Sequence, residues 1–161
     1  MVRSGTKAVV VLMCSLFVVS SRAQGPKPYG PPISVESAKK IAAVALAEAR
    51  KNNWYMAVAV VDPSGTLVYY EKMDNTQTAS ATVAIEKART AAMFKRPSKV
   101  FEDAVVGGGP GLRVLGIPEI MPIEGGIPIV VNDQVVGAIG VSGDSSDHDG
   151  ICAQAGANSM K

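Results

Sequence analysis

The chain has 161 residues, of which 47% are hydrophobic and 19% are charged, and its formal net charge is +2 at pH 7. This length is typical of one domain, and the hydrophobic share suffices for a buried core, which excludes the disordered and fibrous classes. The small net charge offers neither a basic stripe for nucleic acid nor a polybasic patch for an anionic membrane.

The first 23 residues have the layout of a secretory signal peptide. Arg3 and Lys7 precede an apolar run over residues 8–19, and small residues lead up to Ala23. Because the run is too short to span a bilayer comfortably, cleavage after Ala23 is favoured over an uncleaved anchor. Cleavage would leave 13 basic against 14 acidic side chains, a net charge of −1, and a secreted or periplasmic protein without a membrane segment.

Residues 24–32 carry four prolines and two glycines, which predicts an extended, exposed linker. Cys14 would leave with the signal peptide, and Cys152 would remain as a single cysteine that cannot form an internal disulfide. A single domain over residues 33–161 is therefore expected to depend on packing alone.

The first predicted elements of this domain are a helix and a hairpin. Ser34 can cap a helix that ends near Asn52. Strands are expected over residues 54–61 and 66–71, joined by an Asp-Pro-Ser-Gly turn. The apolar face of the helix repeats at three- and four-residue spacing and comprises Ala38, Ile41, Ala42, Ala45, Leu46 and Ala49.

Two more helices follow the hairpin. An alanine-rich segment predicts a long helix over residues 78–95, which Pro97 stops. Ser98 is expected to cap a shorter helix that runs to Val106. The glycines of residues 107–111 are then expected to break regular structure completely.

A second hairpin organises the rest of the domain. Two apolar runs, residues 127–131 and 134–141, flank Asn132-Asp133, which tolerates the positive φ angles of a tight turn. Both runs are apolar at nearly every position, so we expect both faces of this hairpin to be covered, in the centre of the domain. Gly137 and Gly140 in the second run favour close helix packing over ligand contact.

The last predicted helix begins at Ser145 or Ser146, with Ile151, Cys152 and Ala155 on its buried side. Strands thus come in adjacent pairs between helices, which excludes a doubly wound parallel sheet. The pattern predicts an α+β domain, in which helices flank an antiparallel sheet of two hairpins.

Five segments together resemble the GlcG/HbpS family, in the order and spacing of that family. The resemblance implies a profilin-like fold, homo-oligomers of up to eight subunits and, for exported members, binding or handling of haem. The C-terminal domain of PduO-type cobalamin adenosyltransferases is related to the same family. The segments are residues 57–74, 84–98, 110–112, 122–143 and 149–156.

Several residues are candidates for holding such a ligand. Lys87 and Thr90 share a helix face, and Arg96 lies just beyond the helix end, so their region can hold carboxylates such as haem propionates. A buried ion pair of Lys87 with Asp74 or Glu124 is the alternative. Glu124 precedes two glycines that let backbone N–H groups approach a ligand. The candidate ligand-binding set is Met73, Asp74, Lys87, Thr90, Arg96, Glu124, Gly125 and Gly126.

Two residues are candidates for haem iron. His148 is the single histidine, and imidazole is a common iron ligand, but its place between Asp147 and Asp149 favours an ordinary exposed residue. Met73 has a thioether that can ligate iron, although a role as core filler is favoured.

Hydrolase, dehydrogenase and NTPase motifs are absent from the sequence, which argues against an enzyme. The favoured hypothesis is an exported, oligomeric binding protein for haem or a similar planar anionic ligand. The alternative is an enzyme or accessory protein acting on a small hydroxy acid, with Lys87, Arg96 and the Glu124 loop as its carboxylate site.

Overall fold

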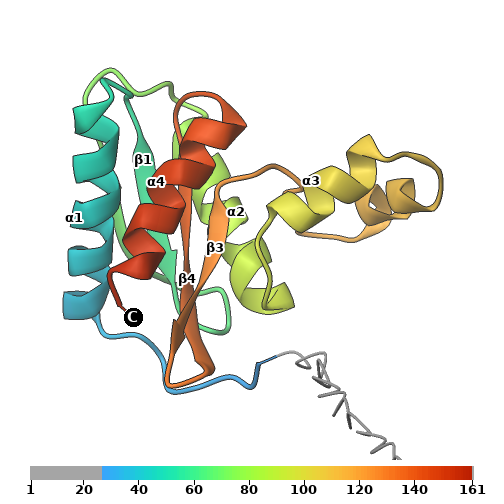
Figure 1. Cartoon of the computed structure of the whole chain (residues 1–161), viewed down its shortest axis with the longest axis horizontal. Coiled ribbons are helices and arrows are strands. Elements are labelled where there is room, and N and C mark those ends of the chain that lie inside the picture. The colour runs from blue at the N-terminus through green and yellow to red at the C-terminus, as the bar shows by residue number, and fades with distance from the viewer. Residues whose placement is uncertain (1–26, 161) are drawn as a thin grey trace, which may run out of the picture.

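The computed structural model describes residues 27–160, so the predicted signal peptide and its cleavage site lie outside the described residues. The predicted helices and strands follow one another in the predicted order, with one additional 3₁₀ helix before the second hairpin (Figure 1). No helix in this part of the chain is long and apolar enough to cross a membrane. The elements are α1 (Val35–Lys51), β1 (Ala57–Val61), β2 (Leu67–Lys72), α2 (Ser80–Phe94), α3 (Lys99–Val106), the 3₁₀ helix η1 (Gly109–Gly116), β3 (Gly126–Val131), β4 (Gln134–Ser142) and α4 (Ser146–Asn158).

The four strands form one antiparallel sheet in the order β2-β1-β4-β3, which confirms the predicted α+β class and both hairpins. Asn132 and Asp133 have φ angles of 48° and 63°, as the tight turn requires. The predicted central position of the second hairpin holds for one of its two strands: β4 pairs with strands on both sides, whereas β3 is an edge strand. Pro128 in β3 lacks an N–H group, which is tolerated at such an edge.

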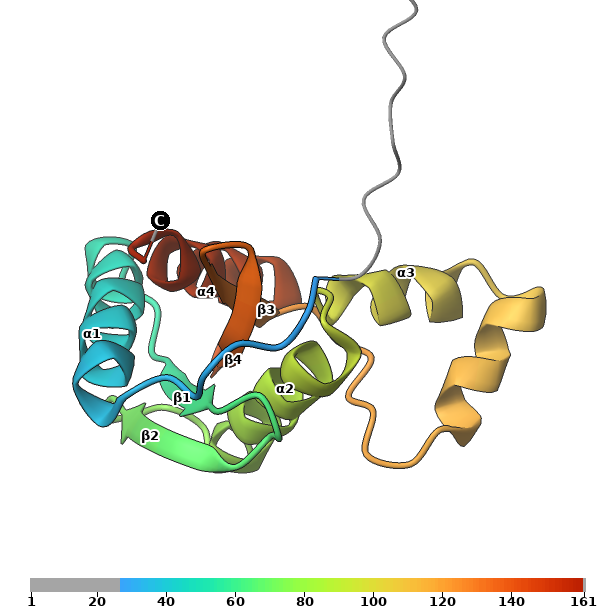
Figure 2. The ribbon, with the colours of Figure 1, turned by 90° about the horizontal axis from the view of Figure 1, so that it is seen from below.

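Helices cover both faces of the sheet. The helices α1 and α4 pack against each other on one face, and α2 lies across β1, β4 and β3 on the other (Figure 2). Ser34 caps α1 by accepting a hydrogen bond from the N–H of Ser37. The buried face of α1 is the predicted one: Ala38, Ile41, Ala42, Ala45, Leu46 and Ala49.

Two strand glycines, Gly126 and Gly140, form the surface on which α2 packs, which we call the glycine seat. A Cβ atom at Gly140 would lie 2.0 Å from the carbonyl oxygen of Ala84, and one at Gly126 would lie 2.2 Å from that of Lys87. The two glycines face each other in the β3–β4 register, so the backbone of α2 rests directly on the sheet. Helix packing is therefore confirmed for Gly140. Gly137 instead lies close to the backbone of β1, where a Cβ atom would be 2.3 Å from the carbonyl oxygen of Val61.

Residues 98–123, which we call the arm, project from the rest of the molecule (Figures 1 and 2). The arm consists of α3, η1 and the return to β3. The glycine-rich residues 107–111 do not break regular structure completely as predicted, because η1 begins at Gly109 with Pro110 in its first turn. We call residues 34–97 and 124–160 the body.

Two predicted helix features are wrong in detail. Ser98 makes no side-chain capping hydrogen bond to α3, and Ser145 makes none to α4. On α4, Ile151 is 48% exposed instead of buried. Asp149 and Gly150 share the buried side with Cys152, because Asp149 meets Lys87 of α2 and Gly150 lies against the side chain of Glu124.

Residues 27–33, which we call the strap, are extended but not free. Tyr29 bridges to Val135, and the N–H of Gly30 and the carbonyl of Pro28 are hydrogen-bonded to Val135 as well. The N–H of Ile33 donates to the carbonyl of Val136. The strap thus lies beside the start of β4, so this part of the predicted linker is docked on the domain.

Candidate functional site

A buried ion pair joins the two helix layers across the edge of the sheet. The Lys87 ammonium on α2 donates to Oδ2 of Asp149 on α4 at 2.7 Å, and the two side chains are 1% and 3% exposed. The predicted alternative of an ion pair for Lys87 is confirmed, but its partner is neither Asp74 nor Glu124. Breaking such a pair by removing one partner is costly, because a charge stays buried without a counter-charge.

The absence of a side chain at Gly125 leaves room for the ion pair between Lys87 and Asp149. Its φ is 126°, and a Cβ atom there would lie 2.6 Å from the carbonyl oxygen of Val141 and 3.0 Å from the Lys87 nitrogen. The carbonyl of Gly125 accepts the N–H of Val141, which holds the loop against β4. A side chain at Gly125 would therefore obstruct the bridge between Lys87 and Asp149.

Burial raises the pKa of the Asp149 carboxyl above its ordinary value, and the nearby Lys87 ammonium opposes that effect. Oδ1 of Asp149 also accepts the N–H of Asp144 at 3.3 Å, so both oxygens have partners. The pair therefore fixes the start of α4 relative to α2 and to the loop before β3.

Glu124 lies on the outer side of the same loop among other carboxylates. Its backbone N–H donates to Oε2 of Glu102, and its own Oε2 is 3.8 Å from the Lys99 ammonium. Burial raises the pKa of Glu124; Lys99 opposes this, whereas Glu102 and Asp147 raise the pKa further. Glu124 is thus a carboxyl that holds its proton more tightly than an exposed glutamate does.

Two hydroxyl groups attach the arm to the body. Ser98 Oγ donates to the carbonyl of Ile123 at 2.6 Å and accepts the N–H of Gly126 at 2.9 Å. Thr90 Oγ1 accepts the N–H of Met121 at 2.8 Å. These bonds hold both ends of the arm at the Glu124 loop, so the base of the arm is well defined.

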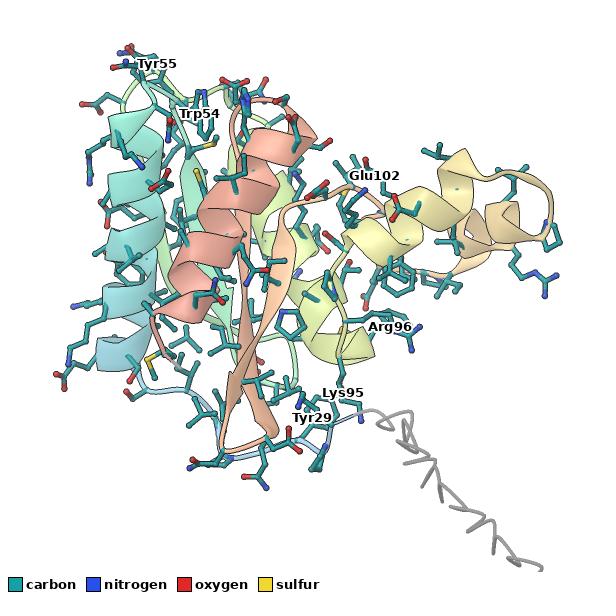
Figure 3. All side chains as sticks on the ribbon, viewed as in Figure 1. Tyr29, Trp54, Tyr55, Lys95, Arg96 and Glu102 are labelled. Atoms are coloured by element: carbon teal, nitrogen blue, oxygen red, sulfur yellow. The ribbon has the colours of Figure 1, made fainter. Side chains whose placement is uncertain are left out.

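The structure brings together five of the eight predicted ligand-binding residues, namely Lys87, Thr90, Glu124, Gly125 and Gly126. The other three lie elsewhere. Met73 packs against the main core and its sulfur accepts the N–H of Met56 at 3.5 Å, while Asp74 is exposed after β2. Arg96 is exposed at the base of the arm, where its guanidinium lies 5.8 Å from the ring centre of Phe101 (Figure 3).

His148 is held by its neighbours. Its ring stacks on Trp54 with centroids 3.9 Å apart, and Nδ1 lies 3.3 Å from a carboxylate oxygen of Asp144. Nε2 lies 3.9 Å from Asp147. In residues 27–160 no group of three or more His, Cys, Asp or Glu side chains is arranged to hold a metal ion.

Sequence reasoning missed Asp149 and Ser98 as parts of the site. Both lie in segments that carry the family resemblance, but each stands at the start of a helix, where serine and aspartate are common without any role in a site. The signal that could have found Asp149 is the buried face of α2, since a lysine on a face of alanines needs a buried counter-charge.

The comparisons with known proteins cover nearly the whole domain. Residues 33–158 match the family described as "Haem degrading protein HbpS-like". The chain belongs to the HbpS-like family. It is 39% identical over 110 residues to the protein GlcG of Escherichia coli strain K12, an alignment that covers 68% of this chain and 81% of GlcG.

Two solved structures support the fold assignment of this HbpS-like chain. A crystal structure of HbpS is 30% identical with a TM-score of 0.74, covering 86% of this chain and 98% of that one. A crystal structure described as a PduOC–haem complex is 23% identical with a TM-score of 0.72, covering 81% and 96%. The second likeness shows the fold alone.

Proposed function

We propose that this HbpS-like protein is an exported, oligomeric binding protein for haem or a similar planar anionic ligand. Family membership supports haem-related binding, and one relative of the same fold was solved with haem. The feature of this chain that carries the proposal is the arm, which combines exposed apolar side chains with exposed cations beside the site at its base.

The chemistry of the arm fits such a ligand. A haem has two apolar faces and two carboxylates, so its site needs apolar contact and cations. Val106, Leu112 and Leu115 are 80%, 49% and 62% exposed. Arg113 lies between the two leucines, and Arg96 is exposed at the base of the arm. The arm therefore offers both kinds of contact.

The same apolar side chains support a homo-oligomer. The arm also exposes Val100, Ile117 and Ile123, so its 26 residues expose six large apolar side chains, as many as the 101 residues of the body do. Such a cluster on a soluble protein marks an interaction site. A second copy of this chain can cover it symmetrically, which would place the ligand between copies.

In this proposal Lys87 is a positioning residue. It is too buried to touch a ligand, and it acts through Asp149 by fixing the Glu124 loop at the base of the arm. Arg96 is the cation that contacts the carboxylate, with a two-point hydrogen-bonding geometry that suits it. His148 is not required, because it is already stacked and faces carboxylates.

The test is a haem titration followed by absorption spectroscopy, with Arg96→Ala, His148→Ala and the matched control Arg50→Ala. Binding should shift and sharpen the main haem band. Arg96→Ala should bind about tenfold more weakly, the effect of losing one charge-assisted contact. The two other variants should match the wild type in affinity and band position.

Two outcomes would overturn the proposal. The absence of any saturable band shift in the wild type would exclude haem. Loss of the band in His148→Ala alone, with normal binding by Arg96→Ala, would place the site at the start of α4 instead.

Export has a separate test. The mature protein isolated from outside the cytoplasm should begin at or near Gln24, because Ala23 ends the small-residue site behind the apolar run. Mass spectrometry of that protein gives the answer directly, and an intact Met1 would contradict the proposed cleavage.

A further inference from the structure

A cavity of about 420 Å³ lies along β3, from Ile127 near the start of that strand to Val135 beyond the turn of the second hairpin. Residues from the strap, the end of α2, the second hairpin and the end of α4 line it. Its volume falls in the range of roughly 300–1,000 Å³ that is usual for small-molecule sites. Neither the haem proposal nor the ion pair uses it.

The walls of this cavity are apolar. Ile127, Pro128 and Val130 of β3 form one side with Val135 of β4, and Ala157 of α4 adds another. Pro128 has no N–H group, so this stretch of edge strand presents one donor fewer to the cavity. The walls therefore suit a hydrocarbon chain or ring better than a polar ligand.

Two lysines supply positive charge at the same cavity. Lys95 has a left-handed backbone with φ of 55°, and its ammonium lies 4.8 Å from the ring centre of Tyr29 (Figure 3). The Tyr29 hydroxyl is 2.8 Å from the Met93 carbonyl at the end of α2, so the ring is fixed in place. Within the described residues, no carboxylate lies within ion-pair distance of Lys95.

Lys27, on the strap, is the second cation. It pairs with Asp133 of the hairpin turn, whose side chain is 75% exposed. An exposed ion pair of this kind contributes little stability, so Lys27 can exchange Asp133 for a ligand carboxylate at small cost. The strap thereby contributes one charged side to the cavity.

We infer that this cavity binds a small amphipathic carboxylate, an acyl or aryl chain that ends in one acid group. The chain lies against the apolar walls of the second hairpin, and the carboxylate lies between Lys95 and Lys27. Gln154 also lines the cavity, and its amide nitrogen donates to Oδ1 of Asn158 at 2.9 Å. Apolar walls with a few polar groups that fix orientation are the usual composition of such sites.

The experiment is an NMR titration of the full mature chain with octanoate, compared with octan-1-ol, which has the same chain without the charge. Octanoate should shift the amide signals of Lys95, Ile127 and Val130 saturably, and octanol should bind at least about tenfold more weakly for lack of the charge-assisted contacts. Lys95→Met should weaken octanoate by about tenfold and leave octanol unchanged.

Two further variants separate this cavity from the rest of the surface. Val130→Trp, which fills the cavity at a half-buried position, should abolish the saturable shifts of both probes. Lys99→Met, which removes a lysine of the arm, should leave the binding of both probes unchanged. Circular dichroism confirms that each variant is folded.

Three results would overturn the inference. One is the absence of saturable octanoate shifts at millimolar concentration. A second is equal affinity for octanol and octanoate, which would leave the lysines without a role. The third is an equal loss in Lys95→Met and Lys99→Met, which would indicate a general charge effect.

Discussion

In the body, Ile41, Leu46 and Ile139 are at most 1% exposed, whereas on the arm Val106 and Leu115 are 80% and 62% exposed. The body encloses most of its apolar side chains between helices and sheet. Among the arm's large apolar side chains, Phe101 is the buried one. The body thus has the packing of a domain that is stable by itself. The arm has the exposed apolar surface that is typical of an interaction site.

The largest effect should come from the ion pair of the body. Lys87→Met should lower the free energy of unfolding by about 3–5 kcal/mol, because Asp149 would remain buried without its counter-charge. The loss should shrink at acid pH, where Asp149 is protonated and needs no partner. Urea denaturation measures the change.

Lys99→Met is the matched control, since Lys99 lies on the arm and its side chain is 48% exposed. It should leave the urea midpoint unchanged. Equal midpoints for the two variants would contradict the prediction that the buried ion pair of the body stabilises the fold more than an exposed lysine of the arm does.

The next effect should come from the glycine seat of α2. Gly140→Ala should cost about 1–3 kcal/mol, because its Cβ atom would overlap the carbonyl oxygen of Ala84 and force α2 off the sheet. Gly116→Ala on the arm, where no atom lies within 4 Å of the added carbon, should cost far less. Thermal unfolding of the two variants compares them directly, and similar losses would contradict the close packing of α2.

Substitutions on the arm should change self-association and leave the stability of the single subunit nearly unchanged. Val106→Asp with Leu115→Asp should weaken self-association at least about tenfold, since charges would replace the apolar contacts. The unfolding free energy of the separated subunit should change by less than about 0.5 kcal/mol. Light scattering at micromolar concentration gives the mass of the assembly.

Ile151→Asp is the control for this pair of substitutions, because Ile151 is 48% exposed on the body. It should keep the wild-type mass. A wild-type protein that is monomeric under the same conditions would refute the proposed role of the arm.

The smallest effect should come from Glu124, where body and arm meet. Its folded-state pKa is raised above the ordinary value of 4.5, so the favourable contribution of this carboxyl is present below pH 4.5 and is lost as the pH rises through the raised pKa. Glu124→Gln cannot ionise and should be more stable than the wild type at pH 7, by less than about 1 kcal/mol. The difference should disappear near pH 4.

Denaturation at both pH values tests this sign, with Glu36→Gln as control. Glu36 is 80% exposed on α1 and should show no such difference. A Glu124→Gln variant that is less stable at pH 7 would show that its contact with Lys99 outweighs its burial.

The elements of the body could be predicted because their signals are local. Apolar spacing defines the buried face of α1, and the turn at Asn132-Asp133 defines the second hairpin. The partner of Lys87 could not be predicted in this way. Spacing within α2 shows that Lys87 lies on a buried face, but it does not say which distant element meets that face.

Ser98 teaches the same lesson at shorter range. A serine before a helix has the same sequence pattern whether its hydroxyl caps that helix or bonds a different segment. Here the hydroxyl bonds Ile123 and Gly126, because the arm returns to the body at that point. Tertiary contacts thus decide between two roles that the local sequence leaves equal.

The bond between Lys87 and Asp149 joins residues 62 positions apart, on helices that lie on opposite faces of the sheet. It can form only after both hairpins have assembled, so we expect it to be absent from most of the folding transition state. Interactions of that kind act mainly on the unfolding rate. Lys87→Met should therefore accelerate unfolding much more than it slows folding, and the pair would lengthen the lifetime of the native state.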